Sequence, residues 1–367
     1  MSTATTTLSP AALGRATLAR QLLLRREPCT PVAAVERLAG MQAQLPRPPH
    51  VGLWSRVASF TREALNSALQ RRELVRATLM RATLHLVSAR DYLQLRATLQ
   101  PVLDRAMRSV LKDRVDRLDV PALLAAATRH LAAGPRSFEA LRDLLAAGDP
   151  DCDERAMGYV VRCQLPLVQV PSDAPWGFPA AAEFTAAEPW LGRSIAADPD
   201  PRALVRRYLA AFGPASVRDA QTWSGLQGLR ATFDALRPEL LCLRDDRKRE
   251  LFDLPDAPRP DAESEAPPRF LPDFDNLVLA HDDRRRLIDD EHRPAIFLKN
   301  LRVLPTFTLA GRVAGTWQSE RKKTAATLVL TPFAALTKPK RSALEPEALA
   351  LLRFLEPDAA SFDLRVE

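Results

Sequence analysis

One unit of sequence recurs along this chain: short helical segments, ended by proline or glycine, followed by a pair of β-like runs. In the first copy Thr61–Arg72 has helical character, and Leu74–Leu79 and Thr83–Ser88 predict two short strands around a turn. Helices followed by a two-stranded ribbon form the winged-helix arrangement, a helix-turn-helix with an appended hairpin. The pattern therefore favours short helices with small sheets between them.

Two more helices are expected before that ribbon. Residues 11–26 are amphipathic, with Leu18, Leu22 and Leu23 on one face. Thr30-Pro31 has the form of an N-cap followed by a first-turn proline, and it predicts a helix that runs to about Leu45. Together with Thr61–Arg72 they supply the three helices of one winged-helix module.

The unit recurs twice more. Gly134-Pro135 precedes Ser137, and Gly213-Pro214 precedes Ser216, so in both copies a Gly-Pro turn leads to a serine that begins a helix. The helices and strands expected around these turns are Leu123–Ala133, Asp153–Cys163, Leu167–Pro171, Pro201–Phe212, Val217–Ser224, Leu226–Leu236 and a strand pair across Leu240–Leu254. We predict three tandem winged-helix modules, at residues 1–120, 121–200 and 201–256.

A different composition begins after the third module. Residues 255–268 are rich in Pro, Asp and Glu and predict a linker or surface loop. Short β-like runs follow at Phe270–Leu279, Ala295–Leu298, Arg302–Leu309, Arg312–Gln318 and Thr324–Leu330, before a helix at Glu345–Leu355. We predict a C-terminal β domain at residues 269–367. The expected fold class is α+β, mostly α with small β, arranged around a basic channel.

Composition limits the chemistry. The four cysteines, Cys29, Cys152, Cys163 and Cys242, lack CxxC spacing and are expected to be reduced, mostly buried thiols. No His/Cys/carboxylate cluster has metal-ligand spacing, and no Gly-rich phosphate loop is present, so we expect no metal and no nucleotide cofactor. Residues 1–12 do not resemble a signal peptide, and no apolar run reaches membrane-spanning length. A soluble, cytoplasmic monomer is expected.

The charge is unevenly distributed. Residues 1–120 hold 19 Lys+Arg against 9 Asp+Glu, a net charge of +10, whereas the remaining residues hold 33 against 36, a net of −3. Nearly all of the excess is arginine, whose planar fork suits phosphate. The asymmetry predicts a polyanionic partner. The alternative is the codon bias of a GC-rich genome, which enriches arginine for reasons unrelated to function.

Gln42-Ala43-Gln44 lies in this basic third, shortly before Pro46. Glutamine does not titrate, but its amide can bind and orient a water molecule. Residues i and i+2 project alike only on extended backbone, so Gln44 should lie at or beyond the helix end, and Pro46 supports this. The other interpretation is that both glutamines cap a helix or are solvated.

Several charged side chains are candidates for DNA contacts. On a strand, Arg81, Thr83 and His85 would share a face, with Arg81 on a phosphate and His85 either orienting a glutamine or hydrogen-bonded in the core. The three consecutive arginines at 284–286 could clamp phosphates. The alternative is that they pair with the nearby carboxylates Asp282, Asp283, Asp289 and Asp290. The complete set of predicted DNA-binding residues is Arg47, His50 (in a loop), Arg56, Arg81, His85, Arg284, Arg285 and Arg286.

Seven short runs together resemble the AlkZ/YcaQ-type winged-helix DNA glycosylases, in order and spacing across about residues 12–330. These runs are Gln42–Gln44, Val51–Trp54, Arg81–Leu86, Gly213–Ala215, Trp223–Leu226, Leu271–Asp275 and Gly311–Trp317. Gln42 and Gln44 match the glutamine-apolar-glutamine form of the family's catalytic motif, found in its antibiotic-resistance branch. Ala82 departs from the pattern, since relatives often carry glycine there.

The resemblance implies a monofunctional glycosylase acting on double-stranded DNA that contains alkylated (N7 or N3) purines, with possible substrates extending to interstrand crosslinks and bulky antibiotic adducts. It implies Gln42 and Gln44 as the catalytic residues. The alternative is a non-catalytic winged-helix DNA-binding protein or transcriptional regulator. The recognition helix of such a regulator would be Leu226–Leu236, which offers only Arg230 and Arg237 for reading bases.

Overall fold

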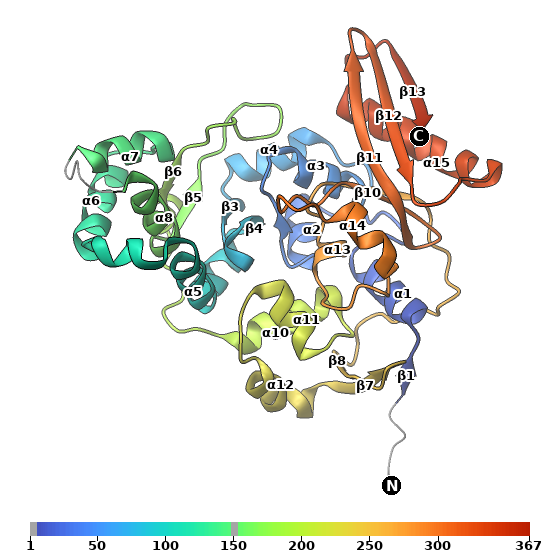
Figure 1. The fold of residues 1–367 in the computed structure, drawn as a ribbon, viewed down its shortest axis with the longest axis horizontal. Coiled ribbons are helices and arrows are strands. Elements are labelled where there is room, and N and C mark those ends of the chain that lie inside the picture. Colours follow the sequence, from blue (N-terminus) through green and yellow to red (C-terminus); the bar gives the residue numbers. More distant parts are fainter. Residues whose placement is uncertain (1–5, 148–152) are drawn as a thin grey trace.

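The structure, a computed structural model, describes residues 6–147 and 153–367 and confirms the α+β class. The C-terminal sheet and the helix α15 (Lys338–Leu355) stand at one end of the molecule, and the helices α5–α8, which lie between Ala89 and Gln164, stand at the other. The strands β3 (Leu74–Thr78) and β4 (Leu84–Ser88) lie between the two ends (Figure 1). The first elements are β1 (Thr7–Leu8), α1 (Pro10–Arg20), α2 (Pro31–Arg37), β2 (Met41–Gln42), α3 (Arg47–Trp54), α4 (Arg62–Gln70), β3 (Leu74–Thr78), the 3₁₀ turn η1 (Met80–Ala82) and β4 (Leu84–Ser88).

The caps of these helices are those that the sequence indicates. The Thr30 and Thr61 side chains accept hydrogen bonds from the backbone of the first turns of α2 and α4. β3 and β4 pair as an antiparallel hairpin, as predicted. The predicted helix to Leu45 is wrong beyond Arg37, because Ala39 and Gly40 adopt positive φ and end it.

The next part of the chain is mostly helical. Its elements are α5 (Ala89–Leu111), η2 (Lys112–Arg117), α6 (Val120–Ala132), α7 (Phe138–Ala146), α8 (Glu154–Gln164), β5 (Leu167–Gln169), β6 (Phe184–Ala186) and α9 (Ala187–Leu191). Ser137 caps α7 after the Gly134-Pro135 turn, as predicted. Strands of the first two predicted modules form one sheet, in the order β2-β4-β3-β5-β6. The module boundaries remain a prediction.

The third set of elements follows the sequence pattern closely. It comprises α10 (Pro201–Phe212), α11 (Val217–Ser224), α12 (Arg230–Leu236), η3 (Arg237–Glu239), β7 (Leu241–Asp245) and β8 (Glu250–Asp253). Ser216 and Asp219 form a reciprocal capping box at the start of α11. β1 pairs with β7 in parallel, so the beginning of the described chain joins this hairpin.

The C-terminal part has more helix than predicted. Its elements are β9 (Arg269–Leu271), α13 (Asn276–Leu279), η4 (Asp290–His292), α14 (Arg293–Ile296), β10 (Thr306–Leu309), β11 (Arg312–Lys322), β12 (Ala325–Pro332), α15 (Lys338–Leu355) and β13 (Ser361–Val366). The strands form one sheet in the order β13-β12-β11-β10-β9. The β-like run Phe270–Leu279 is wrong after Leu271, because the Asp275 side chain caps α13. Ala295–Leu298 is likewise wrong as a β run, since Ala295 and Ile296 belong to α14 and Phe297 forms only an isolated bridge, to Val303.

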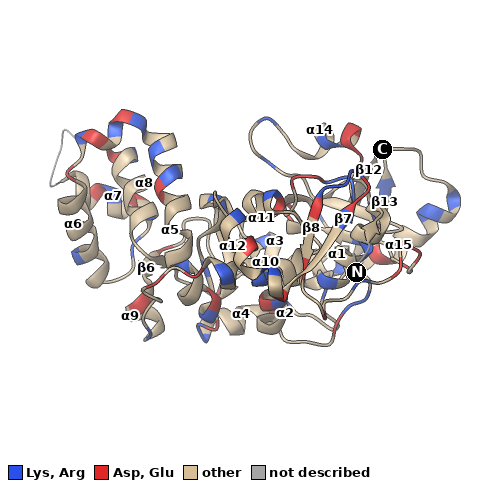
Figure 2. Ribbon diagram, turned by 90° about the horizontal axis from the view of Figure 1, so that it is seen from below, with Lys and Arg blue, Asp and Glu red and all other residues tan. Residues whose placement is uncertain are grey.

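Part of the basic excess of residues 1–120 is used inside the protein. Arg20, Arg26 and Arg56 form ion pairs with Asp253, Glu347 and Asp275, which all lie in later parts of the chain. Lys and Arg are interspersed with Asp and Glu on many elements (Figure 2). Arg20, Arg26 and Arg56 therefore join distant segments of the chain, and the net charge of residues 1–120 overstates how basic the surface is.

Two sequence expectations concern single residue types. Cys29, Cys163 and Cys242 are free thiols, but only Cys163 is buried, and Cys152 lies outside the described residues. The prediction of mostly buried thiols is thus wrong for two of the three described. In the part of the chain that the structure describes, no helix is long and apolar enough to cross a membrane.

Candidate active site

Gln42 lies on strand β2 beside β4, and Gln44 lies in the bend that follows, beyond the end of α2. Gln42 pairs with His85 in the antiparallel β2–β4 ladder, and the Ala43 N–H donates to the Leu84 carbonyl over 2.7 Å. Gly40 permits the close approach of this segment, since a Cβ there would lie 2.7 Å from Val87 Cγ1. The segment is therefore extended at Gln42 and bends at Gln44, so the prediction that Gln44 lies beyond the helix end is confirmed.

Each glutamine carbonyl is held by a donor. Arg81 Nη2 donates to Gln42 Oε1 over 2.7 Å, and the Leu84 N–H donates to Gln44 Oε1 over 3.3 Å. A guanidinium and a backbone N–H only donate, so these contacts fix which end of each amide is oxygen. Gln42 is buried and Gln44 exposed. A carbonyl oxygen has two lone pairs, which leaves each amide able to accept one further hydrogen bond from water.

Arg81 lies in a turn, so the prediction that it shares a strand face with Thr83 and His85 is wrong. Arg81 and Ala82 both have positive φ, 54° and 56°. Left-handed backbone favours glycine, so an alanine at position 82 is held in a conformation that L residues rarely adopt. Arg81 also donates to the Trp223 carbonyl at the end of α11. Its guanidinium therefore connects α11 to Gln42.

His85 is completely buried. Its Nδ1 lies 3.0 Å from the Thr83 carbonyl, to which it must donate, and its Nε2 lies 3.4 Å from Arg81 Nη2. Burial, followed by the charge of Arg81, lowers the pKa of His85 to about 3. The imidazole is neutral at physiological pH. Its prediction as a DNA contact is wrong, and its position matches the alternative of a hydrogen-bonded core histidine.

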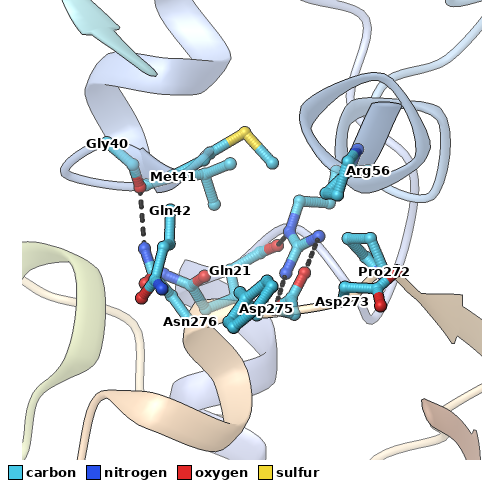
Figure 3. A pocket seen from close by; sticks show the side chains of 12 residues that line it. Gln21, Gly40, Met41, Gln42, Arg56, Pro272, Asp273, Asp275 and Asn276 are labelled. Atoms are coloured by element: carbon cyan, nitrogen blue, oxygen red, sulfur yellow. Dashed lines mark hydrogen bonds and ion pairs between the residues drawn. The ribbon is translucent and has the colours of Figure 1, made fainter. Parts of the chain in front are cut away.

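A small pocket of about 10 Å³ opens beside Gln42, which is room for about one water molecule. Figure 3 shows the side chains around it. Loops and short elements from three distant parts of the chain meet here, and the lining residues are Gln21, Leu38, Gly40, Met41, Gln42, Pro48, Arg56, Pro272, Asp273, Phe274, Asp275 and Asn276. Burial raises the pKa of the Asp273 carboxyl in this wall.

Arg56 belongs to the wall of this pocket and does not reach DNA, so that prediction is wrong. Its side chain is 1% exposed and donates to both Asp275 oxygens over 2.8 and 2.9 Å. It also donates to the Gln21 and Gly52 carbonyls. A buried guanidinium needs such partners, because an unpaired charge in the interior is strongly unfavourable. Arg56 thus fixes the segment that carries Asp275.

His50 and Arg47 occupy α3. His50 was expected in a loop, as a DNA contact or solvated, and both interpretations are wrong: it is buried in the helix, 3.0 Å from Asn66 Oδ1. Burial lowers the pKa of His50 to about 4. Arg47, at the first position of α3, is half-buried and its Nη1 lies 3.4 Å from Ser319 Oγ on β11. Arg47 stays a predicted DNA contact.

The three consecutive arginines do not act as one clamp. Arg286 is buried and donates to the Pro214 carbonyl, so its prediction as a DNA contact is wrong. Arg285 pairs with Asp283 and Asp246, in line with the charge-pairing alternative. Arg284 lies over the Phe297 ring at 4.6 Å. Burial, and then the charge of Arg284, lower the pKa of Arg81 to about 10. The structure therefore brings Gln42, Arg81 and His85 together, with the charge of Arg284 near Arg81.

Sequence reasoning missed Asn276 and Asp273 in the pocket wall. The signal was partly present, since Asp273 lies in the Leu271–Asp275 run that carries the family resemblance. Asn276 follows that run directly. No spacing rule brings it near Gln42, because the contact between the two segments is tertiary. No group of three or more His, Cys, Asp or Glu within residues 6–147 and 153–367 could hold a metal ion.

Replacement of Arg81 tests its positioning of Gln42. Arg81→Met removes the donor that fixes the Gln42 carbonyl, and we expect the single-turnover rate of the catalysed reaction to fall about 10²-fold, the scale of a small misplacement of a reacting group. Affinity for the substrate should change little. Arg108→Met, at an exposed position of α5, is the control. An equal loss in affinity and none in rate would mean that Arg81 binds substrate instead.

Three comparisons relate this chain to known proteins. The family model described as DNA glycosylase AlkZ-like matches residues 35–354. A curated protein of Streptomyces sahachiroi, described as an interstrand DNA cross-link repair glycosylase, is 28% identical over 91% of this chain and 93% of its own length. The solved structure of Streptomyces sahachiroi DNA glycosylase AlkZ superposes with a TM-score of 0.79, at 23% identity, over 98% of this chain and all of that one.

Proposed function

This chain belongs to the AlkZ-like DNA glycosylase family, and we propose that its substrates are cationic N7- or N3-alkylated purines in duplex DNA. The resemblance inferred from the sequence is thereby confirmed, and the chain is a DNA repair glycosylase. The proposal concerns what the family name leaves open: which base is released, and how Gln42 and Gln44 release it without a strong acid or base.

An alkylated purine is already a good leaving group. Alkylation at N7 or N3 places a positive charge on the ring, and when the C1′–N9 bond breaks its electron pair returns to the purine and neutralises that charge. The base then needs no proton from the enzyme. What remains is to stabilise the oxocarbenium-like sugar and to add water at C1′, after which the excess proton passes to solvent.

The observation that carries the proposal is the fixed orientation of the two amides. Arg81 and the Leu84 N–H hold the Gln42 and Gln44 carbonyls, and each oxygen keeps one lone pair. These lone pairs can bind a water proton and present partial negative charge to the developing cation, without reorganisation during the reaction. His85 is neutral, with its proton on Nδ1, so it is not an acid that could protonate an uncharged base and help it to leave.

Base release without strand cleavage is expected. A glycosylase that also cleaves the strand uses an amine nucleophile to attack C1′. Among the described residues that line the pocket beside Gln42, none is lysine. We therefore propose a monofunctional enzyme that leaves an abasic site. Crosslinked purines fit the same chemistry, since each crosslinked base carries an alkyl group, and a relative is described as a cross-link repair glycosylase.

The alternative of a silent sequence-specific regulator has little support in α12. Arg230 and Arg237, the two candidate base-reading residues, both form ion pairs with Glu250 on β8. A regulator would need these side chains for base edges. Only Arg230 lies in α12 itself, since Arg237 begins η3, so the helix offers one arginine and its guanidinium is paired with Glu250.

A base-release assay tests the proposed function. The protein is incubated with a duplex that carries one 7-methylguanine, and we expect free 7-methylguanine by chromatography and an intact strand that breaks only after alkali. An interstrand-crosslinked duplex should give separated strands under denaturing conditions. Tight binding with no abasic product on either duplex would favour the regulator.

A further inference from the structure

Asn276 stands at the start of α13 with its side chain held in one orientation. Its Nδ2 donates to the Gly40 carbonyl over 2.9 Å, two residues before Gln42. A carbonyl can only accept, so the nitrogen end of the amide must face Gly40 and the oxygen end must face away. The residue is 5% exposed, and its position in the pocket wall is visible in Figure 3.

The Asn276 oxygen is an acceptor without a donor. Oδ1 is buried and has no hydrogen-bond partner among the protein groups of the structure's described part. A buried carbonyl in this state is unfavourable, so most such groups in proteins bind a protein donor or an ordered water. Asn276 lines the small pocket beside Gln42, and the size of that pocket indicates which group could donate to Oδ1.

That pocket fits one water and places it against Gln42. Its volume is about 10 Å³, and both Gln42 and Asn276 are among its lining residues. A buried water needs two to four polar partners, and a pocket with an unsatisfied oxygen on one wall and a glutamine amide on another supplies them. The Arg56–Asp275 ion pair and the Asp275 cap of α13 keep Asn276 in place.

We propose that Asn276 is a third catalytic amide, whose Oδ1 accepts a hydrogen bond from the water that Gln42 places for attack on C1′. The inference rests on the proposed function and extends it by a residue from a distant segment. The water oxygen forms the new bond to C1′, the C1′–N9 electron pair leaves with the purine, and the proton released from the added water passes to solvent. Asn276 orients the water and takes no proton.

Asn276→Ala, with a matched control, tests this role first. Asn276→Ala should lower the single-turnover rate of 7-methylguanine release at least tenfold at saturating protein, with affinity for the duplex unchanged. Asn66→Ala is the control, because Asn66 also bonds a buried partner, His50, away from the pocket. Its rate should stay within twofold of the wild type. Thermal unfolding of all three proteins separates the loss of rate from the loss of folded protein.

Asn276→Asp provides a readout that a purely structural role would not change. A carboxyl in the water site titrates where an amide does not, so the ratio of variant to wild-type rate should depend on pH. Taking the ratio cancels any titration of the lesion itself. A ratio that is flat with pH, together with an Asn276→Ala rate within twofold of the wild type, would overturn the proposal.

Failure of the proposed function would be seen separately. If the wild-type protein released no base from any alkylated duplex, the glycosylase chemistry proposed above would be wrong. A high-resolution crystal structure then tests the water site itself. We expect an ordered water within hydrogen-bond distance of Asn276 Oδ1 and of the Gln42 amide, and a dry pocket at that position would contradict the site.

Discussion

Gln42→Ala combined with Gln44→Ala is expected to lower the single-turnover rate of 7-methylguanine release about 10³-fold. Loss of one preorganised group that stabilises a transition state costs about 10²–10³ in rate, and here both amides are removed. Because the two act on one water, the single substitutions should each cost nearly as much as the pair. Gln42→Ala should have the larger single effect, since Gln42 is the buried member, which lines the pocket.

Affinity for the duplex should change less than about threefold in the same variants, because neither side chain carries the charge that dominates DNA binding. Gln227→Ala, at an exposed position, is the matched control and should keep the wild-type rate. Rates are measured with protein in excess over DNA, so that chemistry and not product release is followed. Full activity in the double variant would remove the glutamine pair from the mechanism.

Asp275→Ala is expected to lower the free energy of unfolding by about 3–5 kcal/mol. The carboxylate neutralises Arg56, and both side chains are 1% exposed. Removal of one partner leaves an uncompensated buried charge, which is the costly way to break a buried ion pair. The variant also loses the side-chain cap of α13. Urea unfolding followed by circular dichroism measures the change.

Two comparisons make this stability prediction specific. Asp289→Ala breaks the exposed Arg312–Asp289 pair and should cost no more than about 1 kcal/mol. Arg56→Met with Asp275→Leu removes both charges and should recover much of the stability lost in Asp275→Ala, although the cap of α13 stays lost. If Asp275→Ala were as stable as Asp289→Ala, the ion pair would not hold the pocket wall.

The sequence predicted the local structure well where local signals decide it. Thr61, Ser137 and Ser216 begin helices as N-caps, and the two hairpins β3–β4 and β7–β8 lie where the strand pattern put them. The loop expected around His50 was wrong. Prolines such as Pro48 and Pro49 suggest a loop, but they are also tolerated in the first turn of a helix, and α3 begins at Arg47.

The side-chain partners could not be predicted in the same way. Arg56 and Arg286 read as free basic groups in the sequence, but their partners Asp275 and Pro214 lie 219 and 72 residues away. The position of Gln44 beyond a helix end was predicted correctly from Pro46, because the residue before a proline is disfavoured in the helical region, and Gln44 lies in a bend. The orientation of the Gln42 amide depends on Arg81, and the position of Asn276 depends on the packing of α13 against Gly40.

The measurement that tests the central claim most directly compares two isomeric lesions in one duplex sequence. 7-Methylguanine and O6-methylguanine carry the same methyl group, but only the first is cationic, so only the first leaves the sugar without an acid. We predict that the protein releases 7-methylguanine in a single turnover and leaves O6-methylguanine in place under the same conditions. Comparable release of both bases would contradict an active site made of amides that only position water.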